Sequence, residues 1–294
     1  MEPPIEPDES DCCNSGCNPC ILDVYEEQLR KYKQRTSSLI TKNNCISLTS
    51  YAIFKLINIE KHWKQTFLFT FEYCGPQKGE PKVDASLLYK PGQHFLMKGK
   101  TYDEEFTRAY TPIPIENQSD LQFTTLIKLY EYGVMSRYLK KISIGRETLW
   151  RGPYGDFTIN YDIQHMLLIA QGTGLAPLYS IAYDIVNNDE CCTFLKLFFC
   201  CKDSNSIYLR EQLYKLSTYW NFSYEVFLSE SQGISPKYNE IIHPKKLRCD
   251  EIETYLKDKH KSVNILICGS ENFMEDIKKH VLRSSVAEED VFTF

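Results

Sequence analysis

Short hydrophobic stretches separated by turn residues dominate the chain from about residue 49 to residue 159. The stretches are rich in β-branched and aromatic residues and are bounded by Pro-Gly, Gly-Pro and acidic turns, which is typical of antiparallel strands. One helix is expected over Arg137–Ile142, with Ser136 as its cap. The pattern indicates an antiparallel barrel or sandwich. Strands are expected at Ala52–Ile59, Thr66–Phe71, His94–Met97 and Leu121–Tyr130.

A different pattern begins near His165, where apolar strands alternate with helical stretches. This alternation predicts a doubly wound parallel sheet that binds ligands at the carboxyl ends of its strands. Strands are expected at Met166–Ala170, Phe194–Cys201, Ser223–Leu228 and Asn264–Cys268. Helices are expected from the glycine turn after the first strand to about Asn187, and at Leu209–Ser217, Cys249–Asp258 and Asn272–Leu282.

The N-terminal part of the chain differs from both regions. Its first ten residues are acidic and contain prolines, which favours disorder, and a dense group of cysteines follows. Residues 23–33 carry acids early and bases late, as a helix dipole prefers, and residues 34–44 form a polar linker. We therefore expect an acidic, cysteine-bearing segment over 1–40, a strand-rich domain over 48–160 and an α/β domain over 161–294.

The distribution of charge along the chain gives limited information about binding partners. The chain has a formal net charge of -5, yet residues 41–160 carry a surplus of four positive charges between acidic flanks. A basic middle segment suits an acidic protein partner, although scatter explains four charges equally well. The acidic flanks argue against nucleic-acid binding, which requires a basic stripe.

Several features bear on location and redox state. No apolar run approaches the roughly 20 residues of a transmembrane helix, and the N-terminus lacks the chemistry of a presequence. We expect a cytoplasmic monomer, with membrane association through a partner left open. The twelve cysteines are expected to be reduced rather than paired. Those after Cys20, apart from Cys268, are interpreted as small buried hydrophobic residues.

Two short motifs in the strand-rich region could contact a phosphorylated, flat ligand. In Arg108-Ala-Tyr-Thr-Pro112, the arginine can fork onto a pyrophosphate, and Tyr110 on the same strand face can stack on a ring. A surface arginine beside a core tyrosine is the plainer reading. Gly133-Val-Met-Ser136 opens the expected helix, where free backbone N–H groups attract phosphate, although an ordinary helix cap fits as well.

Three glycine segments follow. Trp150–Phe157 contains Gly-Pro-Tyr-Gly and is interpreted as a rigid turn that closes the barrel. Gly172-Thr-Gly174 ends a strand and precedes Pro177 in a helical first turn, so its backbone can approach a dinucleotide closely. Cys268-Gly269 ends another strand, and its thiol is either structural or packed beside a nicotinamide.

Taken in order, the motifs R-x-Y-T, G-x-x-S, G-P-x-G, G-T-G-x-x-P, C-G and a last aromatic residue resemble the ferredoxin–NADP reductase superfamily. The chain from about Ser50 to Phe294 is most similar to the NADH–cytochrome b5 reductase family. The resemblance implies an antiparallel six-stranded Greek-key barrel that binds FAD, followed by a doubly wound parallel-sheet domain that binds NADH.

The resemblance also implies roles for individual residues. Arg108 would hold the FAD pyrophosphate, with Ala109 beside it, Tyr110 on the isoalloxazine and Thr111 near flavin N5. Thr111, Lys128 and Cys268 would be the catalytic residues, Lys128 placing NADH and Cys268 lying by the nicotinamide. The remaining cofactor-binding positions would be Ile127 at the flavin edge, Val134, Met135 and Ser136 at the FAD phosphates, Gly172, Thr173, Gly174 and Gly269 at NADH, and Phe294 near the flavin.

The chain departs from the family at several of these places. Ala109 replaces a proline, Gln171 a glycine and Ala176 a hydroxyl residue, and Ser270-Glu-Asn272 replaces a proline run. Ser229 stands where the family carries the acid that favours NADH, but Glu230 follows it and no arginine lies beside it in the sequence. NADH is therefore the expected donor.

The segment containing Cys12, Cys13, Cys17 and Cys20 resembles an oxidoreductase-like N-terminal module. Four thiolates within nine residues could bind zinc or an iron–sulfur cluster, but the paired spacing of a zinc ribbon is absent. Free reduced thiols are the alternative.

The function implied by the resemblance is hydride transfer from NADH to FAD, followed by single-electron transfer to a haem protein, cytochrome b5 or a similar acidic partner. One alternative is an NAD(P)H reductase for another acceptor, a quinone or another haem protein. The other is a binding module that has lost its flavin.

Overall fold

A computed structural model of the chain describes residues 43–78, 84–101, 104–230, 235–257, 259, 262–284 and 286–294, together with positions 7, 25, 26 and 29. The predicted helix over 23–33 and the thiols Cys12, Cys13, Cys17 and Cys20 lie outside this described part, apart from the isolated positions. The chain separates into two compact units. In the first, the described strands form a parallel pair, β1 (Asn43–Asn44) with β4 (Ala85–Ser86).

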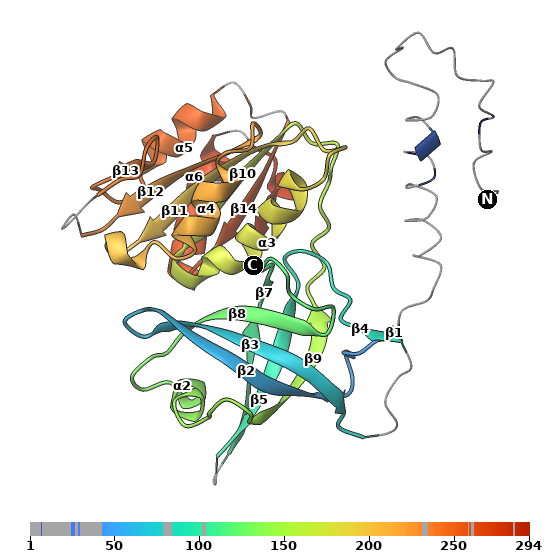
Figure 1. The fold of residues 1–294 in the computed structure, drawn as a ribbon. Coiled ribbons are helices and arrows are strands. Elements are labelled where there is room, and N and C mark those ends of the chain that lie inside the picture. Colours follow the sequence, from blue (N-terminus) through green and yellow to red (C-terminus); the bar gives the residue numbers. More distant parts are fainter. Residues whose placement is uncertain are drawn as a thin grey trace. The chain divides into compact units, whose positions relative to one another are not determined.

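The second unit contains two larger sheets. The first of them is antiparallel, in the order β6-β5-β9-β2-β3-β8-β7. Figure 1 labels these strands except β6. Successive strands skip places in this order, as in a Greek key. Its elements are β2 (Ala52–Trp63), β3 (Thr66–Pro76), β5 (His94–Lys100), β6 (Glu105–Tyr110), β7 (Pro112–Ile113), β8 (Gln122–Lys128), helix α2 (Val134–Leu139) and β9 (Glu147–Tyr154).

The order of this sheet closes it into a barrel. Strands β6 and β7 stand at opposite ends of the order, yet Thr111 alone separates them along the chain. Together, β6, Thr111 and β7 therefore form one continuous strand, which pairs with β5 through β6 and with β8 through β7. Counted as one strand, β6 and β7 give the six-stranded barrel expected from the sequence.

Aromatic rings fill the barrel. The rings of Phe71 and Phe123 contact the buried Trp150, with centroids 4.8 and 4.9 Å away. Along β2 the buried positions alternate with exposed ones at first, because successive side chains of a strand point to opposite faces. Each buried large apolar side chain contributes about 1.5–3 kcal/mol to the free energy of folding.

The segment interpreted as a turn is largely a strand. Glu147–Tyr154 forms β9, paired with both β2 and β5, and only Gly155 and its successors leave the sheet. Gly152 and Pro153 lie where the register with β5 jumps from Arg151 to Tyr154. A bulge of this kind needs no ladder hydrogen bond, so it accommodates a proline inside a strand.

The capping prediction is also wrong. Helix α2 begins at Val134 with Gly133 as its N-cap, so Ser136 lies inside the first turn. The Ser136 Oγ accepts a hydrogen bond from the backbone N–H of Tyr130 at 2.9 Å and thus ties the helix to the segment after β8. Strand β8 ends at Lys128, two residues earlier than expected.

The second sheet is parallel, in the order β13-β12-β11-β10-β14-β15. The central strands β10 and β14 are largely apolar and buried along most of their length, as a sheet covered on both faces requires. Its strands are β10 (His165–Gln171), β11 (Phe194–Cys201), β12 (Phe222–Leu228), β13 (Ile241–His243), β14 (Val263–Cys268) and β15 (Val291–Thr293). The short edge strands β13 and β15 were not predicted.

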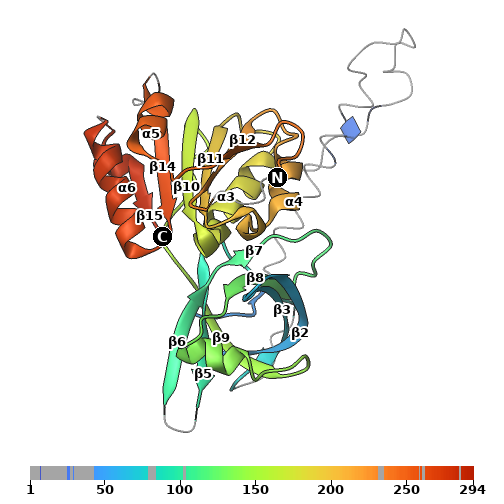
Figure 2. The ribbon, with the colours of Figure 1, turned by 90° about the vertical axis from the view of Figure 1, so that its left-hand side faces the viewer.

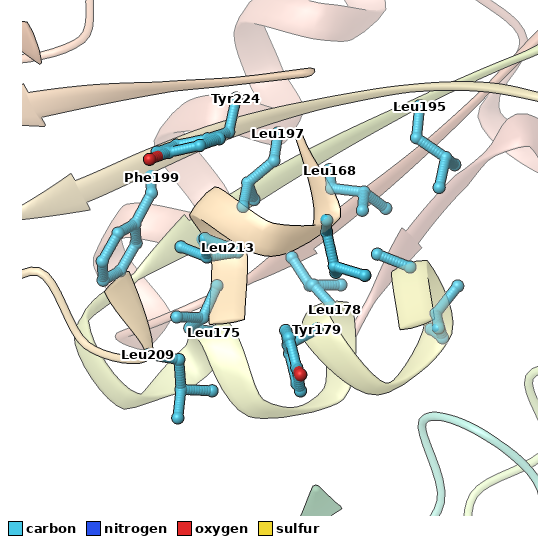
Figure 3. Close-up of a cluster of buried hydrophobic side chains, with 14 of the residues drawn as sticks. Leu168, Leu175, Leu178, Tyr179, Leu195, Leu197, Phe199, Leu209, Leu213 and Tyr224 are labelled. Atoms are coloured by element: carbon cyan, nitrogen blue, oxygen red, sulfur yellow. The ribbon is translucent and has the colours of Figure 1, made fainter. Parts of the chain in front are cut away.

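Helices cover both faces of this sheet (Figure 2). On one face α3 (Leu175–Val186) and α4 (Arg210–Leu216) pack on the cluster drawn in Figure 3, where Leu178 and Leu213 lie near Leu197. On the other, α5 (Cys249–Leu256) and α6 (Glu271–Arg283) pack on a separate cluster. Single 3-10 turns lie at Gly172–Gly174 (η2), Ser204–Ser206 (η3) and Glu288–Asp290 (η4).

The cysteines of the described chain follow the prediction only in part. Cys45 and Cys191 are buried, as predicted. Cys74 and Cys192 are exposed, so burial was wrong for these two. Both lie at the ends of strands or in turns, where the neighbouring sequence does not determine which way a side chain points.

Candidate active site

A cavity of about 990 Å³ lies where residues of the barrel and of the parallel sheet meet. A volume at the upper end of the range for small-molecule sites leaves room for a large cofactor. Most of the predicted site residues line it: Arg108, Ala109, Tyr110, Thr111, Ile127, Lys128, Val134, Met135, Ser136, Thr173, Gly174, Cys268, Gly269 and Phe294.

A second cavity of about 1410 Å³ adjoins the first. It runs along the carboxyl ends of the parallel strands, where open α/β sheets bind their ligands. Gly172, the remaining predicted site residue, lines this second cavity. Both cavities are lined by Lys128, Tyr130, Thr173, Gly174 and Gly269.

The strand that closes the barrel presents four of the predicted residues, Arg108 to Thr111, to the first cavity. Arg108 is exposed, and no carboxylate of the described residues forms an ion pair with it. Its Nη1 donates to the Thr107 carbonyl at 2.7 Å, so the guanidinium keeps further donors for a ligand. An unpaired guanidinium in a ligand-sized cavity fits a pyrophosphate.

Tyr110 and Thr111 continue this strand toward the parallel sheet. The Tyr110 ring packs edge-on against Trp150, with centroids 5.9 Å apart, so its orientation is fixed by the barrel core. Burial raises the pKa of the Tyr110 hydroxyl well above its usual value. Tyr110 therefore stays neutral and offers an aromatic face and a hydrogen-bond donor.

Lys128 and Tyr130 stand at the end of β8, between the two cavities. The Lys128 Nζ lies 5.5 Å from the centroid of the Tyr130 ring, a favourable cation–π distance. Tyr130 is 57% exposed, so its ring is open to a ligand in either cavity. Tyr130 was missed because the sequence placed it inside a strand rather than after one.

The Gly172–Gly174 loop touches the Cys268–Gly269 turn closely. A Cβ atom on Gly174 would lie 2.5 Å from the Cys268 carbonyl oxygen and 2.9 Å from the Gly269 nitrogen. Gly172 has φ +58, the left-handed region that glycine adopts without strain, and no atom lies within 4 Å of its would-be Cβ. Thus Gly174 is required by packing, whereas Gly172 is required by backbone conformation.

Two departures from the family pattern contact each other. The Gln171 Oε1 accepts hydrogen bonds from the Ser270 hydroxyl at 2.8 Å and from the Ser270 backbone N–H at 3.2 Å. The bonds connect the ends of β10 and β14, which are adjacent in the sheet. A glycine and a proline at these positions could make neither bond, so the two substitutions are complementary.

Cys268 and Phe294 are connected through backbone and side chain. The Phe294 N–H donates to the Ile267 carbonyl at 3.1 Å, and the Cys268 thiol lies 3.7 Å from the Phe294 carbonyl oxygen, which accepts its proton. The Phe294 ring packs edge-on against Phe157 at 5.4 Å. Burial raises the pKa of the Cys268 thiol to about 12, so the thiol is neutral at physiological pH.

His94 is another cavity residue that was not singled out from the sequence. His94 begins β5, lines the first cavity and stacks on Tyr154 at 5.9 Å. Burial lowers the pKa of its imidazole, so the ring is neutral near pH 7. Its position at the start of an apolar strand offered no signal beyond an ordinary strand end.

Comparison with known proteins bears on the same architecture. Residues 55–159 match the oxidoreductase FAD-binding domain, residues 168–279 the oxidoreductase NAD-binding domain, and residues 1–40 the N-terminal segment of oxidoreductase-like proteins. The human protein described as NADH-cytochrome b5 reductase-like is 33% identical, over 99% of this chain and 94% of its own length. The mouse protein of the same description is 30% identical, over 99% and 95%.

The chain belongs to the NADH–cytochrome b5 reductase family. It is an oxidoreductase that combines an FAD-binding barrel with a parallel-sheet NAD-binding domain. The reductase also carries the oxidoreductase-like N-terminal segment that the cysteine spacing resembled.

Solved structures share the fold of the reductase. The cytochrome b5 reductase domain of Ulva prolifera nitrate reductase aligns with a TM-score of 0.71 at 19% identity, over 86% of this chain and all of that domain. The CS-b5R domains of human Ncb5or align with a TM-score of 0.69 at 24% identity, over 83% of this chain and 69% of that one.

Two further features concern the described residues alone. None of their helices is long and apolar enough to span a bilayer. Within the same residues, histidine, cysteine and acidic side chains do not gather into a metal-binding group. The four N-terminal cysteines lie outside that search.

Proposed function

We propose that this reductase oxidises NADH through a bound FAD and passes the electrons singly to a haem protein, cytochrome b5 or a similar acidic partner. The observation that carries the proposal is the junction of the two cavities. The first is lined by the predicted FAD residues, the second follows the carboxyl ends of the parallel strands, and they meet at Lys128, Thr173 and Gly174. Two dinucleotides lying in these cavities would meet at their reactive ends.

When bound, FAD accepts a hydride from the nicotinamide and releases its electrons one at a time. The chain supplies position rather than acid–base chemistry. Arg108 would hold the pyrophosphate with its unpaired guanidinium, and the Val134 and Met135 backbone N–H groups, which have no partner within the helix, would bind the FAD phosphates beside Ser136. Ala109 leaves the strand surface open next to Arg108.

The junction would hold the two rings against each other. Tyr110, fixed by Trp150, would support one face of the flavin, while Thr111 and the Ile127 backbone would contact its edge. Lys128, Gly172, Thr173, Gly174 and Gly269 would position the nicotinamide, with Phe294 closing the flavin side. The neutral Cys268 thiol would lie beside the nicotinamide without introducing a charge. Aligned, desolvated reactants can account for many orders of magnitude in rate.

The acceptor is inferred from the family and from charge. The relatives are described as NADH-cytochrome b5 reductases or as NADH-cytochrome b5 reductase-like. The segment 41–160, which contains the barrel strands, carries the surplus of four positive charges. Complementary charge accelerates the encounter with an acidic partner, and this acceleration falls as salt is added.

One absorbance experiment tests the proposal. The purified full-length protein should show a flavin spectrum, and NADH should bleach it under anaerobic conditions. Steady-state turnover with cytochrome b5, ferricyanide and quinones then ranks the acceptors, and the cytochrome b5 rate should fall with ionic strength. Protein that is colourless and binds no added FAD would instead be an interaction module. A flavoprotein that reduces quinones but not cytochrome b5 would refute the proposed acceptor.

A further inference from the structure

The far end of the second cavity is lined by cations from three adjacent strands. Strands β11, β12 and β13 are neighbours in the parallel sheet. Lys202 follows β11, Ser229 follows β12, and Lys246 and Arg248 follow β13; all four residues line the cavity. The carboxyl ends of parallel strands meet at one sheet edge, so residues distant in sequence converge here.

Backbone hydrogen bonds hold Lys202 and Ser229 side by side. The Ser229 N–H donates to the Cys201 carbonyl at 3.1 Å, and the Ser229 hydroxyl donates to the Lys202 carbonyl at 3.4 Å. The next residue, Glu230, donates its N–H to the same Lys202 carbonyl at 2.8 Å. The position of the Ser229 side chain is thus fixed by the edge of the sheet.

This end of the cavity lies opposite the junction with the flavin cavity. The junction is built after β10, and β13 is the third strand from β10. With strands about 4.8 Å apart, Ser229 after β12 lies roughly 10 Å from the junction, and Lys246 and Arg248 after β13 lie roughly 14 Å from it. An extended dinucleotide with its nicotinamide at Gly174 would therefore place its adenosine half between Ser229 and the residues after β13.

The charge of this end is positive. Lys246 and Arg248 are exposed, and no carboxylate of the described residues forms an ion pair with either side chain. Lys202 pairs with Glu230 at 3.2 Å, but both side chains are more than half exposed, and such pairs contribute little and exchange readily. The acidic residue that lines the cavity in the described part of the chain is Asp276, on α6.

We propose that Ser229, Lys202, Lys246 and Arg248 form a subsite for the 2′-phosphate of NADPH, so that the reductase accepts NADPH as well as NADH. The inference rests on the proposed function, since it assigns the donor of the same site. A carboxylate at this edge would accept hydrogen bonds from the two ribose hydroxyls of NADH and repel a 2′-phosphate. With a neutral serine in that place, the three neighbouring cations offer donors and positive charge to a phosphate dianion instead.

The same cations could serve the 5′-phosphate that both coenzymes contain. A 2′-phosphate subsite and a 5′-phosphate site can be distinguished by comparing the affinities of two ligands. Adenosine 2′,5′-bisphosphate and 5′-AMP differ only by the 2′-phosphate, so their affinity ratio reports the subsite and nothing else.

Calorimetric titration of the full-length holoprotein with these two ligands tests the subsite without turnover. The bisphosphate should bind at least tenfold more tightly than 5′-AMP. Lys246→Ala and Arg248→Ala should each reduce this ratio about tenfold, as expected for a lost charge-assisted hydrogen bond. Ser229→Glu should bring the ratio to one or below, because its carboxylate repels the phosphate.

Lys257→Ala is the matched control, because Lys257 is exposed at the other end of α5 and does not line the cavity. It should leave the ratio unchanged. Equal affinities for the two ligands in the unmodified protein would overturn the inference. So would variants that weaken both ligands equally, since the cations would then bind the common phosphate. Thermal unfolding of each variant identifies any that fail to fold, and the double variant Lys246→Ser, Arg248→Ser provides a second test.

Flavin bleaching separates this inference from the proposed function. Bleaching by NADH and NADPH with a tenfold ligand preference supports both. Bleaching by NADH alone, without the preference, removes only the subsite. A ligand preference in a protein that neither nucleotide bleaches keeps the subsite and removes the proposed redox reaction.

Discussion

Gly174 and Cys268 approach each other so closely that a Cβ atom on the glycine would lie 2.5 Å from the Cys268 carbonyl oxygen. The obstructing atom belongs to the backbone of β14 and cannot rotate away as a side chain would. The two residues come from adjacent strands whose carboxyl ends form the junction of the two cavities. The contact therefore sets the width of the site at the place where the two rings are proposed to meet.

Gly174→Ala should separate the two loops. We expect the free energy of unfolding to fall by about 1–3 kcal/mol, the usual cost of overpacking. The rate of flavin reduction by NADH should fall about 100-fold, since displacements near 1 Å have effects of that size. Urea unfolding and stopped-flow absorbance measure the two effects.

Gly172→Asn provides the contrast in stability. No atom lies within 4 Å of a Cβ at Gly172, and asparagine tolerates the left-handed backbone found there. Its unfolding free energy should change by less than that of Gly174→Ala. If the Gly174 variant were as stable and as fast as the parent protein, the close contact would not constrain the site.

Arg108→Ala should weaken retention of FAD. The exposed guanidinium has no carboxylate partner in the described chain. Its removal therefore takes a pyrophosphate contact from FAD without disrupting an internal ion pair. We expect the dissociation constant of FAD to rise about tenfold or more, the value of one charge-assisted contact. Flavin fluorescence during titration of the apoprotein measures it.

Arg283→Ala is the control for charge, because Arg283 is exposed in the last turn of α6 and lines neither cavity. It should retain FAD like the parent protein. Equal flavin affinity in both variants would contradict the assignment of Arg108 to the pyrophosphate.

Cys268 should add to the loss of stability at alkaline pH. Its thiol has a pKa of about 12 in the folded protein because of burial, whereas the ordinary value is 9.0. The folded state thus favours the protonated thiol. The resulting stabilisation is complete below pH 9 and decreases as the pH rises toward 12, by at most about 1.4 kcal/mol per pH unit.

Comparison of the parent protein with Cys268→Ala between pH 8 and pH 10.5 isolates this contribution. The unfolding free energy of the parent should decline more steeply with pH than that of the variant, because alanine does not titrate. Parallel curves for the two proteins would show that the thiol is not protected from ionisation.

Glu240 should stabilise the edge of the parallel sheet through its charge. Its buried carboxylate pairs with Arg210, accepts the Tyr224 hydroxyl at 2.9 Å and accepts the Lys237 N–H at 2.8 Å. Burial works to raise the pKa of Glu240, but hydrogen bonds from these partners outweigh it, so the pKa lies below its usual value. The stabilisation is present above about pH 4.5 and is lost as the pH falls through the depressed value.

Glu240→Gln should lower the unfolding free energy at pH 7 by about 3 kcal/mol, because it leaves the Arg210 charge without its partner. The difference between parent and variant should shrink as the pH falls below 4.5. Glu253→Gln, at an exposed position of α5, should have little effect. A difference that is constant from pH 7 to pH 3.5 would show that packing, not charge, supports this contact.

Much of the candidate site could be predicted from local sequence. Gly174 and Cys268 stand at strand ends that the hydrophobic pattern indicates, Arg108 and Tyr110 belong to a recognisable short motif, and the order of these motifs along the chain pointed to the family. Predictions from local sequence failed where contacts with distant residues, rather than the adjacent residues, determine the backbone conformation. Pro153 indicated a turn but occupies a bulge within β9. The pairing of β9 with β5 continues on both sides of this bulge.

The amino-acid sequence by itself determined the two kinds of sheet, because the spacing of apolar residues depends only on the local backbone repeat. It also determined which residue types stand at the strand ends. The tertiary structure alone decided that Lys202, Ser229, Lys246 and Arg248 share one end of a cavity, and that Thr111 joins the two edges of the barrel. These relations depend on which strands pair, and long-range pairing is selected by burial over the whole chain rather than by any local pattern.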